Sequence, residues 1–435
     1  MLSSLMSSRA TYLAGEPCFW LMGRRGKSRP SDLAQVKRVL VVRLDEIGDV
    51  LMTTPFLREL RQNLPNAWIT LVVKPNVRNL VERCPYVNEV ITYDWNVSRP
   101  PGALWRHYKA LRLAWQHLWK RRFDLAILPR WDADYYDATF LLYFSGAPWR
   151  VGYSERVSRE KHQRTRGYDR LLTHLLDDRS LKHEVERNLE VIRHLGGTVQ
   201  EDRLELWTAE EDEAFAQTLL SQHGVRDHEL VIAFAPGAGA PKRLWPVERF
   251  AEIGSWLRDE YGSRFVLIGG ADEEHLGDAL ERSLGPCAVN AVGRTTLRRA
   301  AALIRRCRLF VGTDSGPMHL AAAVGVPVVE LSCHPRSGAS WSRNSPLRFR
   351  PWGVEHTVLQ PTAPVPPCMD ECVAGTAHCI LGITVEEART AVAERLRQSC
   401  MLGRTGPIRS GSPPPRLSAG STPQSDAGRR AGHRQ

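Results

Sequence analysis

The sequence lacks any long, unbroken hydrophobic run. A helix that crosses a bilayer needs about 18 or more consecutive apolar residues. The best apolar stretch of this chain, Met318–Ser332, is interrupted by His319, Gly325, Pro327 and Glu330. The N-terminal segment also lacks the continuous apolar core of about 7–15 residues that precedes the cleavage site of a secretory signal. We therefore expect neither a membrane-spanning helix nor a signal peptide.

A paired cysteine framework is missing too. The chain has nine cysteines, an odd number, and most of them are scattered. This usage is typical of proteins in a reducing compartment, so the interpretation is a cytoplasmic protein.

One group of cysteines is close in sequence, namely Cys368, Cys372 and Cys379 with His378 beside them. Three cysteines and a histidine are a donor set that zinc accepts. The spacing is not the usual pair separated by two residues, however, and adjacent residues such as His378 and Cys379 rarely bind the same ion. We favour packing or a redox-labile pair and expect no metal.

Basic residues are in excess, but not where a folded nucleic-acid-binding face would need them. The net charge is +11 in 435 residues, and residues 401–435 alone hold six Arg against one Asp. Residues 1–36 form the other basic segment. Such tails could attract anionic lipid or nucleic acid without specificity. Peripheral binding at the inner face of the cytoplasmic membrane therefore stays open, and no specific nucleic-acid partner is expected.

Between the tails, short β-branched segments alternate with amphipathic helical ones, which is the pattern of parallel α/β sheets. We expect two Rossmann-like domains facing across a cleft. Clefts between domains are favoured ligand sites. Strands are predicted at 38–43, 68–73, 88–93 and 124–129, and then at 230–235, 265–268, 287–291, 309–312 and 327–331. Helices are predicted near 49–63, 76–83 and 104–121, with an insertion near 150–185.

The expected domain boundaries follow from these elements and from the composition of the tails. The tail rich in Gly, Pro, Ser and Arg cannot bury enough apolar surface to become ordered. The boundaries are a flexible basic extension over 1–36, a first domain over 37–200, a second over 201–385, a helix over 386–400 that could cross back to the first domain, and a disordered tail over 401–435.

The segment 44–50 (LDEIGDV) directly follows the first strand and opens a helix. Gly48 permits a tight turn with close backbone approach. Asp49 is then placed at the carboxyl end of the sheet, where open α/β folds bind ligands, and could accept a proton from an attacking hydroxyl. The alternative is that Asp49 only caps its helix.

The segment 236–246 (PGAGAPKRLWP) lies between a strand and a helix. Small residues such as Gly237 allow the backbone to approach a phosphate, and Lys242 or Arg243 supplies charge. The segment matches neither the dinucleotide fingerprint nor a P-loop. An ordinary strand-to-helix loop remains the alternative.

The segment 310–319 (FVGTDSGPMH) is a strand that runs into a turn and a helix start. Free backbone amides of Ser315, Gly316 and Met318 could face a diphosphate. Asp314 could cap the helix or hold the loop. His319 could donate to a phosphate oxygen or be a satisfied core histidine.

Two weaker candidates complete the set. In the segment 269–274 (GGADEE), Asp272 could bind ribose hydroxyls, by analogy with dinucleotide domains, or belong to an acidic first helical turn. The basic stretch 150–185 includes Arg156, Lys161 and Arg164. It could contact a phosphorylated or acidic acceptor, or be a solvated loop.

Taken together, three segments resemble glycosyltransferase family 9, the ADP-heptose:lipopolysaccharide heptosyltransferases, over roughly 36–396. They are RVLVVRLDEIGDVLMTTPFLREL, APGAGAPKRLWPVERFAEI and FVGTDSGPMHLAAAVGVPVVELS, in that order. The resemblance implies the glycosyltransferase-B architecture, with an acceptor domain first and a donor domain second. It also implies inverting, metal-independent transfer of a heptose or related sugar, without a cofactor, from a nucleotide-sugar such as ADP-heptose to a glycolipid or glycan at a membrane surface.

The resemblance assigns roles to the candidate residues. Asp49 is the implied general base, with Gly48 on the acceptor side. The implied diphosphate site consists of Lys242, Arg243, Asp314, Ser315, Gly316, Met318 and His319, and the implied nucleotide site of Gly237 and Asp272. A sugar-nucleotide epimerase of the same architecture and a non-catalytic nucleotide-sugar or glycan-binding relative are the alternatives. The sequence leaves the sugar, the base, the acceptor and the oligomeric state open.

Overall fold

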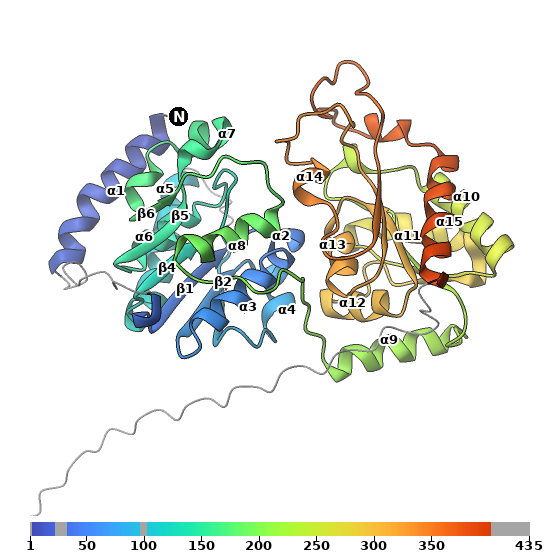
Figure 1. Ribbon diagram of the computed structural model, residues 1–435, viewed down its shortest axis with the longest axis horizontal. Coiled ribbons are helices and arrows are strands. Elements are labelled where there is room, and N and C mark those ends of the chain that lie inside the picture. The colour runs from blue at the N-terminus through green and yellow to red at the C-terminus, as the bar shows by residue number, and fades with distance from the viewer. Residues whose placement is uncertain (1, 22–32, 96–101, 402–435) are drawn as a thin grey trace, which may run out of the picture.

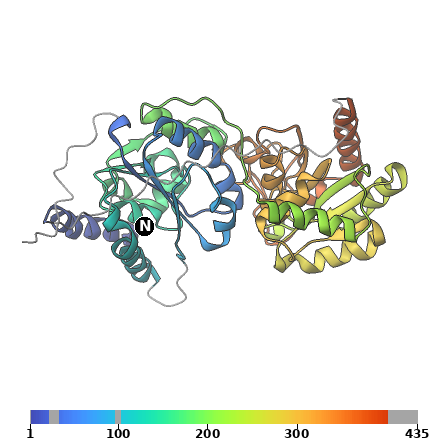
Figure 2. The same ribbon diagram turned by 90° about the horizontal axis from the view of Figure 1, so that it is seen from below.

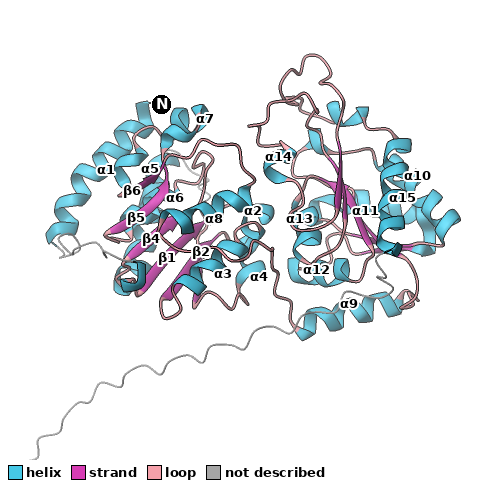
Figure 3. Ribbon diagram, in the orientation of Figure 1, coloured by secondary structure: helices cyan, strands magenta, loops and turns pink. Residues whose placement is uncertain are grey.

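The computed structural model describes residues 2–21, 33–95 and 102–401. Two α/β domains lie side by side, and they remain so in the perpendicular view (Figures 1 and 2). Each domain holds a six-stranded parallel sheet with helices around it (Figure 3). The first sheet has the order β3-β2-β1-β4-β5-β6, and the second the order β12-β11-β10-β7-β8-β9. Both orders are that of a Rossmann fold, read from opposite edges.

The strands of the first sheet are short and largely buried on both faces, as parallel sheets between helices require. The central strand pairs with β2 and β4 in parallel, with Val41 opposite Leu71 and Ile127. The strands are β1 (Arg38–Arg43), β2 (Trp68–Val73), β3 (Glu89–Thr92), β4 (Leu125–Leu128), β5 (Trp149–Tyr153) and β6 (His174–Leu176).

The helix predicted over 49–63 is two helices, α2 (Ile47–Leu51) and α3 (Thr54–Asn63). Pro55 lacks an amide hydrogen, so it cannot bond to the Leu51 carbonyl. The Thr54 hydroxyl donates to that carbonyl instead, at 2.7 Å. The break makes α2 a single short turn that carries Gly48 and Asp49. The other helices of this domain include α4 (Arg78–Val81), α5 (Gly102–Leu113), α6 (Ala138–Phe144), α7 (Arg159–Thr165) and α8 (Glu184–His194).

Residues 150–185 are not an insertion. They supply β5, α7 and β6, which complete the first sheet. Arg150, at the start of this basic stretch, is buried, and its guanidinium donates to the carbonyls of Leu171 and Ala147, both at 2.7 Å.

The expectation of a loose segment over 1–36 is also corrected in part, because helix α1 (Leu2–Leu21) packs on the first domain. Phe19 is buried, with its ring 5.4 Å from that of Tyr143. The Tyr143 hydroxyl donates to the Tyr12 carbonyl at 3.3 Å. Tyr12 and Phe19, seven positions apart on α1, both lie next to Tyr143 and so place one face of α1 against α6.

The second domain begins after the chain leaves α8, and α9 (Glu210–Gln222) already packs on α12 of this domain. Its strands are β7 (Val231–Ala235), β8 (Arg264–Leu267), β9 (Ala288–Asn290), β10 (Leu309–Thr313), β11 (Val328–Leu331) and β12 (His356–Leu359). Its helices include α10 (Val247–Tyr261), α11 (Glu274–Leu284), α12 (Leu297–Arg305), α13 (Gly316–Ala323), α14 (Pro346–Phe349) and α15 (Val385–Met401).

The last helix does not cross back to the first domain. Helix α15 packs against α10 and the strands β10 to β12 (Figure 1), and Arg395 is paired with Glu355 at 2.8 Å. Its apolar residues Ala388, Val392 and Leu396 recur at four-residue intervals and are buried in the core of the second domain. The predicted tail beyond it lies outside the described residues. In the part of the chain that the structure describes, no helix is long and apolar enough to cross a bilayer.

Candidate active site

The predicted segments 44–50 and 310–319 lie next to each other where the two domains are in contact. Helix α2 of the first domain faces α13 of the second (Figure 1). A Cβ atom on Gly48 would lie only 2.4 Å from His319 Cδ2, so a larger residue could not stand there without displacing the imidazole. Gly316 lies in the same way against the side chain of Ile47. The structure therefore brings the segment around Asp49 together with the start of α13.

Asp49 is the third residue of α2, whose N-cap is Glu46, so it is not the N-cap residue. Its side chain is 28% exposed, and Oδ1 lies 3.4 Å from the Arg43 guanidinium. Burial raises the pKa of Asp49 to about 6, against the opposing effect of Arg43, and nearby carboxylates add to the rise. A carboxylate with a pKa near neutrality is suited to proton transfer.

A buried charge network lies behind Asp49, and sequence reasoning did not identify it. Arg43 lies 3.1 Å from the carboxylate of Asp45, which is also paired with Arg130. Arg43 further donates to the Pro129 carbonyl at 3.1 Å. Because Arg43 is shared among these partners, it compensates the charge of Asp49 only in part.

A second charge network joins the two domains. Arg348, in α14, is fully buried, and its guanidinium lies 2.7 Å from Asp132 and 2.6 Å from Glu184, both in the first domain. Beside it, the rings of Trp131 and Trp341 are stacked at 5.9 Å, again across the junction. Only Asp134 accepts from amides of the first turn of α6, whereas Asp132 binds Arg348.

The two basic residues of the segment 236–246 have separate partners. Arg243 donates to the Asp314 carbonyl at 3.1 Å, and its guanidinium also lies 3.5 Å from the Asp314 carboxylate. Lys242 instead donates to the Cys372 carbonyl at 2.6 Å. Arg243 is therefore the basic side chain beside the β10–α13 turn, and Lys242 ties its loop to the cysteine-bearing segment.

The start of α13 offers fewer amides than predicted. The amide of Met318 donates to the Ser315 carbonyl at 3.1 Å and is not free. Ser315 is the N-cap, and its hydroxyl donates to the Thr313 carbonyl rather than to the helix. The amides of Ser315 and Gly316, before the helix and at its first residue, remain for an anionic ligand.

His319 is buried at the junction, and its Nδ1 has no protein partner among the described residues. Burial lowers the pKa of His319 to about 4, although the Asp314 carboxylate opposes the shift. At neutral pH the imidazole is therefore uncharged, and it can act as a neutral hydrogen-bond donor rather than as a cation.

The residues predicted for the nucleotide lie at the ends of β7 and β8. The Gly237 carbonyl accepts from the Thr313 hydroxyl at 2.6 Å. A Cβ on Gly237 would lie 2.0 Å from the Glu273 carboxyl group. Asp272 is exposed, whereas Glu273 is half-buried and accepts from the Gly270 amide at 2.8 Å. Glu273, and not the predicted Asp272, is the carboxylate next to Gly237.

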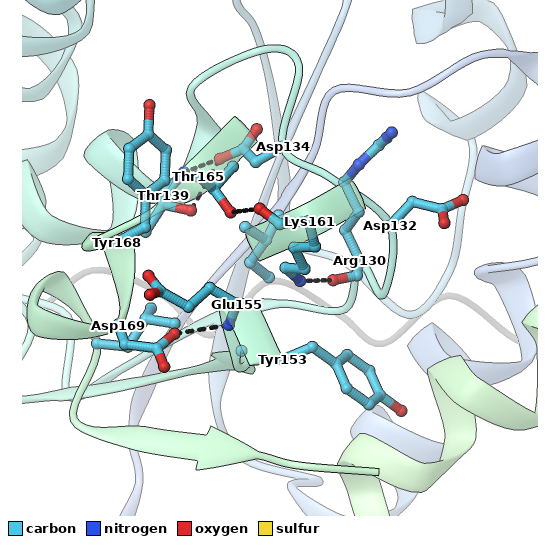
Figure 4. A pocket seen from close by; sticks show the side chains of 13 residues that line it. Arg130, Asp132, Asp134, Thr139, Tyr153, Glu155, Lys161, Thr165, Tyr168 and Asp169 are labelled. Carbon is cyan, nitrogen blue, oxygen red and sulfur yellow. Dashed lines mark hydrogen bonds between the residues drawn. The ribbon is translucent and has the colours of Figure 1, made fainter. Parts of the chain in front are cut away.

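The basic residues predicted for an acceptor are not equivalent. Lys161 is buried in a pocket of the first domain, where its ammonium donates to the Arg130 carbonyl at 3.0 Å (Figure 4). It also donates to the Trp131 carbonyl at 3.1 Å. Burial lowers the pKa of Lys161 to about 7. This lysine supports the loop after β4 and cannot reach the surface, which corrects its predicted role.

Arg156 and Arg164 are the two predicted acceptor residues that remain near the surface. Arg156 lies 3.8 Å from Asp177, and its side chain is more than half exposed. Arg164 is also exposed, and its guanidinium lies 4.4 Å from the ring centroid of Tyr135. Arg343 of the second domain contacts the same ring from 5.1 Å. Cationic side chains from both domains therefore gather around Tyr135.

With this geometry established, the comparisons with known proteins decide the family. The model of "Glycosyltransferase family 9 (heptosyltransferase)" matches residues 110–378. The chain belongs to glycosyltransferase family 9. It is therefore a glycosyltransferase enzyme, and its two sheets are those of the glycosyltransferase-B architecture.

Relatives and solved structures of this family agree. The chain is 28% identical over 302 residues to lipopolysaccharide heptosyltransferase 2 of Escherichia coli, covering 68% of this chain and 82% of that protein. A family 9 glycosyltransferase from Veillonella parvula has a TM-score of 0.69 at 25% identity and covers 85% of this chain and 100% of its own. The ADP-heptose LPS heptosyltransferase II structure of E. coli has a TM-score of 0.61 at 23% identity, over 83% and 99% of the two chains, and shows the fold.

Proposed function

We propose that this family 9 enzyme transfers a heptose, or a closely related sugar, from an ADP-sugar to a glycolipid acceptor of the lipopolysaccharide-core type, with inversion at the anomeric carbon. The observation that supports the proposal is the close approach of Gly48 to His319, since Asp49 follows Gly48 in α2 and His319 lies in the first turn of α13. The names of the relatives, lipopolysaccharide heptosyltransferases 2 and 3, support heptose and the acceptor class.

Asp49 acts as the general base. An acceptor hydroxyl attacks the anomeric carbon from the face opposite the diphosphate, and its proton passes to the Asp49 carboxylate. The new carbon–oxygen bond forms as the bond to the diphosphate oxygen breaks, so the nucleoside diphosphate leaves with the bonding electron pair. A raised pKa supports this role, because a base with a pKa near the working pH is effective.

The leaving diphosphate is stabilised by the second domain. The amides of Ser315 and Gly316 are directed from a helix start, where the helix dipole favours an anion. Arg243, whose guanidinium lies 3.5 Å from the Asp314 carboxylate, is the basic side chain beside these amides. These groups aim at negative charge that grows in the transition state, which is where electrostatic stabilisation is most effective. In this proposal they take the place of a catalytic metal.

Exposed aromatic residues support an acceptor at a membrane surface. Trp105 and Tyr108 on α5, and Trp115 in the helical turn Ala114–Leu118 that continues it, are exposed. Helix α1 exposes Trp20 nearby, since the ring centroids of Phe19 and Trp119 lie 6.2 Å apart. Tryptophan and tyrosine prefer the boundary between lipid and water. We propose that this aromatic face rests on the membrane that holds the acceptor.

Vesicle sedimentation tests the aromatic face. Changing Trp105 and Trp115 together to Ala should reduce binding to anionic phospholipid vesicles about tenfold or more, because each buried aromatic ring contributes strongly at such an interface. Trp68→Ala is the matched control, because it removes a comparably exposed indole at the start of β2. If both variants sediment with vesicles to the same extent as the parent chain, the proposal that this face binds the membrane is refuted.

The main test compares Asp49→Asn with Asp259→Asn, which changes a carboxylate on α10 whose side chain is 67% exposed. Asp49→Asn should lower the rate of sugar transfer by about 10²–10⁴-fold while ADP still binds. Asp259→Asn should transfer at the parental rate. Undiminished transfer by Asp49→Asn would exclude it as the base. Turnover of nucleotide-sugar without acceptor would favour an epimerase, and binding without turnover a non-catalytic relative.

A further inference from the structure

The three cysteines and the histidine that sequence spacing set aside converge in the structure. The donor atoms of Cys368, Cys372, His378 and Cys379 all lie within 4.8 Å of one another. His378 Nδ1 is 3.5 Å from the sulfur of Cys368 and 3.5 Å from that of Cys379. A tetrahedral zinc ion with ordinary bond lengths holds sulfur and nitrogen ligands about 3.6 Å apart. The sequence objection therefore fails, because the neighbours His378 and Cys379 point to one place.

The surroundings of the sulfur atoms are those of a ligand shell. Cys372 and Cys379 are fully buried, and Cys368 is nearly so. The amide of Val373 donates to the Cys368 sulfur at 3.4 Å, and the amide of Val365 donates to that of Cys379 at 3.5 Å. Such backbone donors stabilise thiolates and orient them toward a metal. Packing alone requires neither the convergence of four donors nor amides aimed at sulfur.

We propose that Cys368, Cys372, His378 and Cys379 bind one tetrahedral metal ion, of which Zn²⁺ fits this donor set best. Sulfur and imidazole ligands together favour zinc over Mg²⁺ or Ca²⁺, which prefer oxygen. Binding releases the three thiol protons, because the thiolate is the ligand. Four protein ligands fill the tetrahedral coordination shell and leave no open position, so the ion has a structural role.

The metal segment contacts two loops of the second domain, the segment 236–246 and the loop 339–342. The Cys372 carbonyl accepts from Lys242, on the loop that carries Arg243. The preceding residue, Glu371, accepts from the Ser342 hydroxyl at 2.6 Å. Asp370 accepts through its carbonyl from the Ala339 amide at 2.7 Å. Residues 370–372, of which Cys372 is a metal ligand, thus hold the two loops. In this proposal the ion fixes the positions of these three residues.

Elemental analysis of the full-length chain tests the proposal directly. The chain should be purified through a tag that needs no immobilised metal and then measured for zinc and iron by mass spectrometry. We expect about one metal ion per chain, with zinc predominant. Removing the metal with a chelator should lower Tm by roughly 5–10 °C. It should also speed hydrogen exchange at the amides of 338–345, and addition of zinc should reverse both changes.

Variants separate this site from cysteine loss in general. Cys372→Ser should reduce the metal content at least fivefold, whereas Cys287→Ser, outside the cluster, should retain it. Substitution by Co²⁺ adds a readout that does not depend on variants, since cobalt bound to thiolates absorbs strongly in the near ultraviolet. A parent chain that holds no metal and takes up none when zinc is added under reducing conditions would overturn the proposal. These measurements involve no sugar transfer, so their outcome is independent of the proposed function.

Discussion

The two domains have the same strand order but carry opposite chemistry at equivalent strand ends. In each, the first strand of the domain, β1 or β7, and the fourth, β4 or β10, are neighbours at the centre of the sheet. The loop after β1 leads to the acid Asp49, whereas the loop after β7 leads to Arg243. After β4 the chain presents Asp132 to the other domain, and after β10 it presents backbone amides.

Under the proposed function, this difference divides the work of the transfer reaction between the two domains. The first domain holds its acid within a buried network of Arg43, Asp45 and Arg130, so that the charge of Asp49 is only partly compensated. The second domain uses a helix start and one arginine, which together suit a diphosphate. The chemistry of each domain depends on the loops at its strand ends and not on the fold itself.

The largest effect should come from breaking the link between the domains. Arg348→Met leaves the buried carboxylates of Asp132 and Glu184 without their shared partner. Loss of one member of a buried ion pair typically costs about 3–5 kcal/mol. We therefore expect the free energy of unfolding, measured by urea denaturation, to fall by about that amount.

Arg350→Met is the matched control for this prediction. Arg350 follows the same short helix, but its side chain is only half-buried and donates to the Leu347 carbonyl at 3.4 Å. Its unfolding free energy should change by less than about 0.5 kcal/mol. A similar loss in both variants would mean that the link between Arg348 and the first domain contributes little.

Arg348 also marks the limit of what the sequence could predict. The strand β10 was recognisable because a buried parallel strand is a continuous apolar run. The start of α13 was recognisable because Ser, Gly and Pro mark a helix start. Nothing local distinguishes Arg348 from the chain's other arginines, since its partners Asp132 and Glu184 lie more than 160 residues away.

Other errors have the same physical origin. Strand β5 was missed because Arg150 looks like a surface residue, although backbone carbonyls satisfy its guanidinium within the domain. Lys161 was misplaced for the same reason. A buried cation that bonds to carbonyls has no sequence signature, and Lys161 was therefore misassigned. A glycine at a crowded contact does have one, because no other residue fits there, and Gly48 was therefore identified.

A smaller effect should distinguish the two basic residues of the donor side. Arg243→Gln removes the cation beside Asp314 and should weaken ADP binding by about ten- to a hundredfold, as expected for a charge-assisted hydrogen bond. Lys242→Gln should weaken it by about threefold or less, because Lys242 donates to the Cys372 carbonyl instead of facing α13. Isothermal titration with ADP measures both. A larger loss for Lys242→Gln would reverse the assignment.

The smallest effect concerns pH, and it links Asp49 to stability as well as to rate. With a pKa of about 6, the base is protonated in acid, so kcat/KM for transfer should fall about tenfold for each pH unit below that value and level off above it. Asp49→Asn removes this dependence from the residual rate.

Stability should change in the opposite direction. The pKa of Asp49 is raised on folding from 3.8 to about 6, so the folded state holds the proton more tightly than the unfolded chain does. The stabilisation from that proton is complete below pH 3.8 and is lost as the pH rises through 6. Asp49→Asn should therefore have a Tm close to that of the parent chain at about pH 4 and a Tm higher by roughly 1–3 °C at about pH 8. If the variant were instead less stable at the higher pH, the carboxylate would serve to hold Arg43 in place, and its raised pKa could not be the property on which the first domain's chemistry depends.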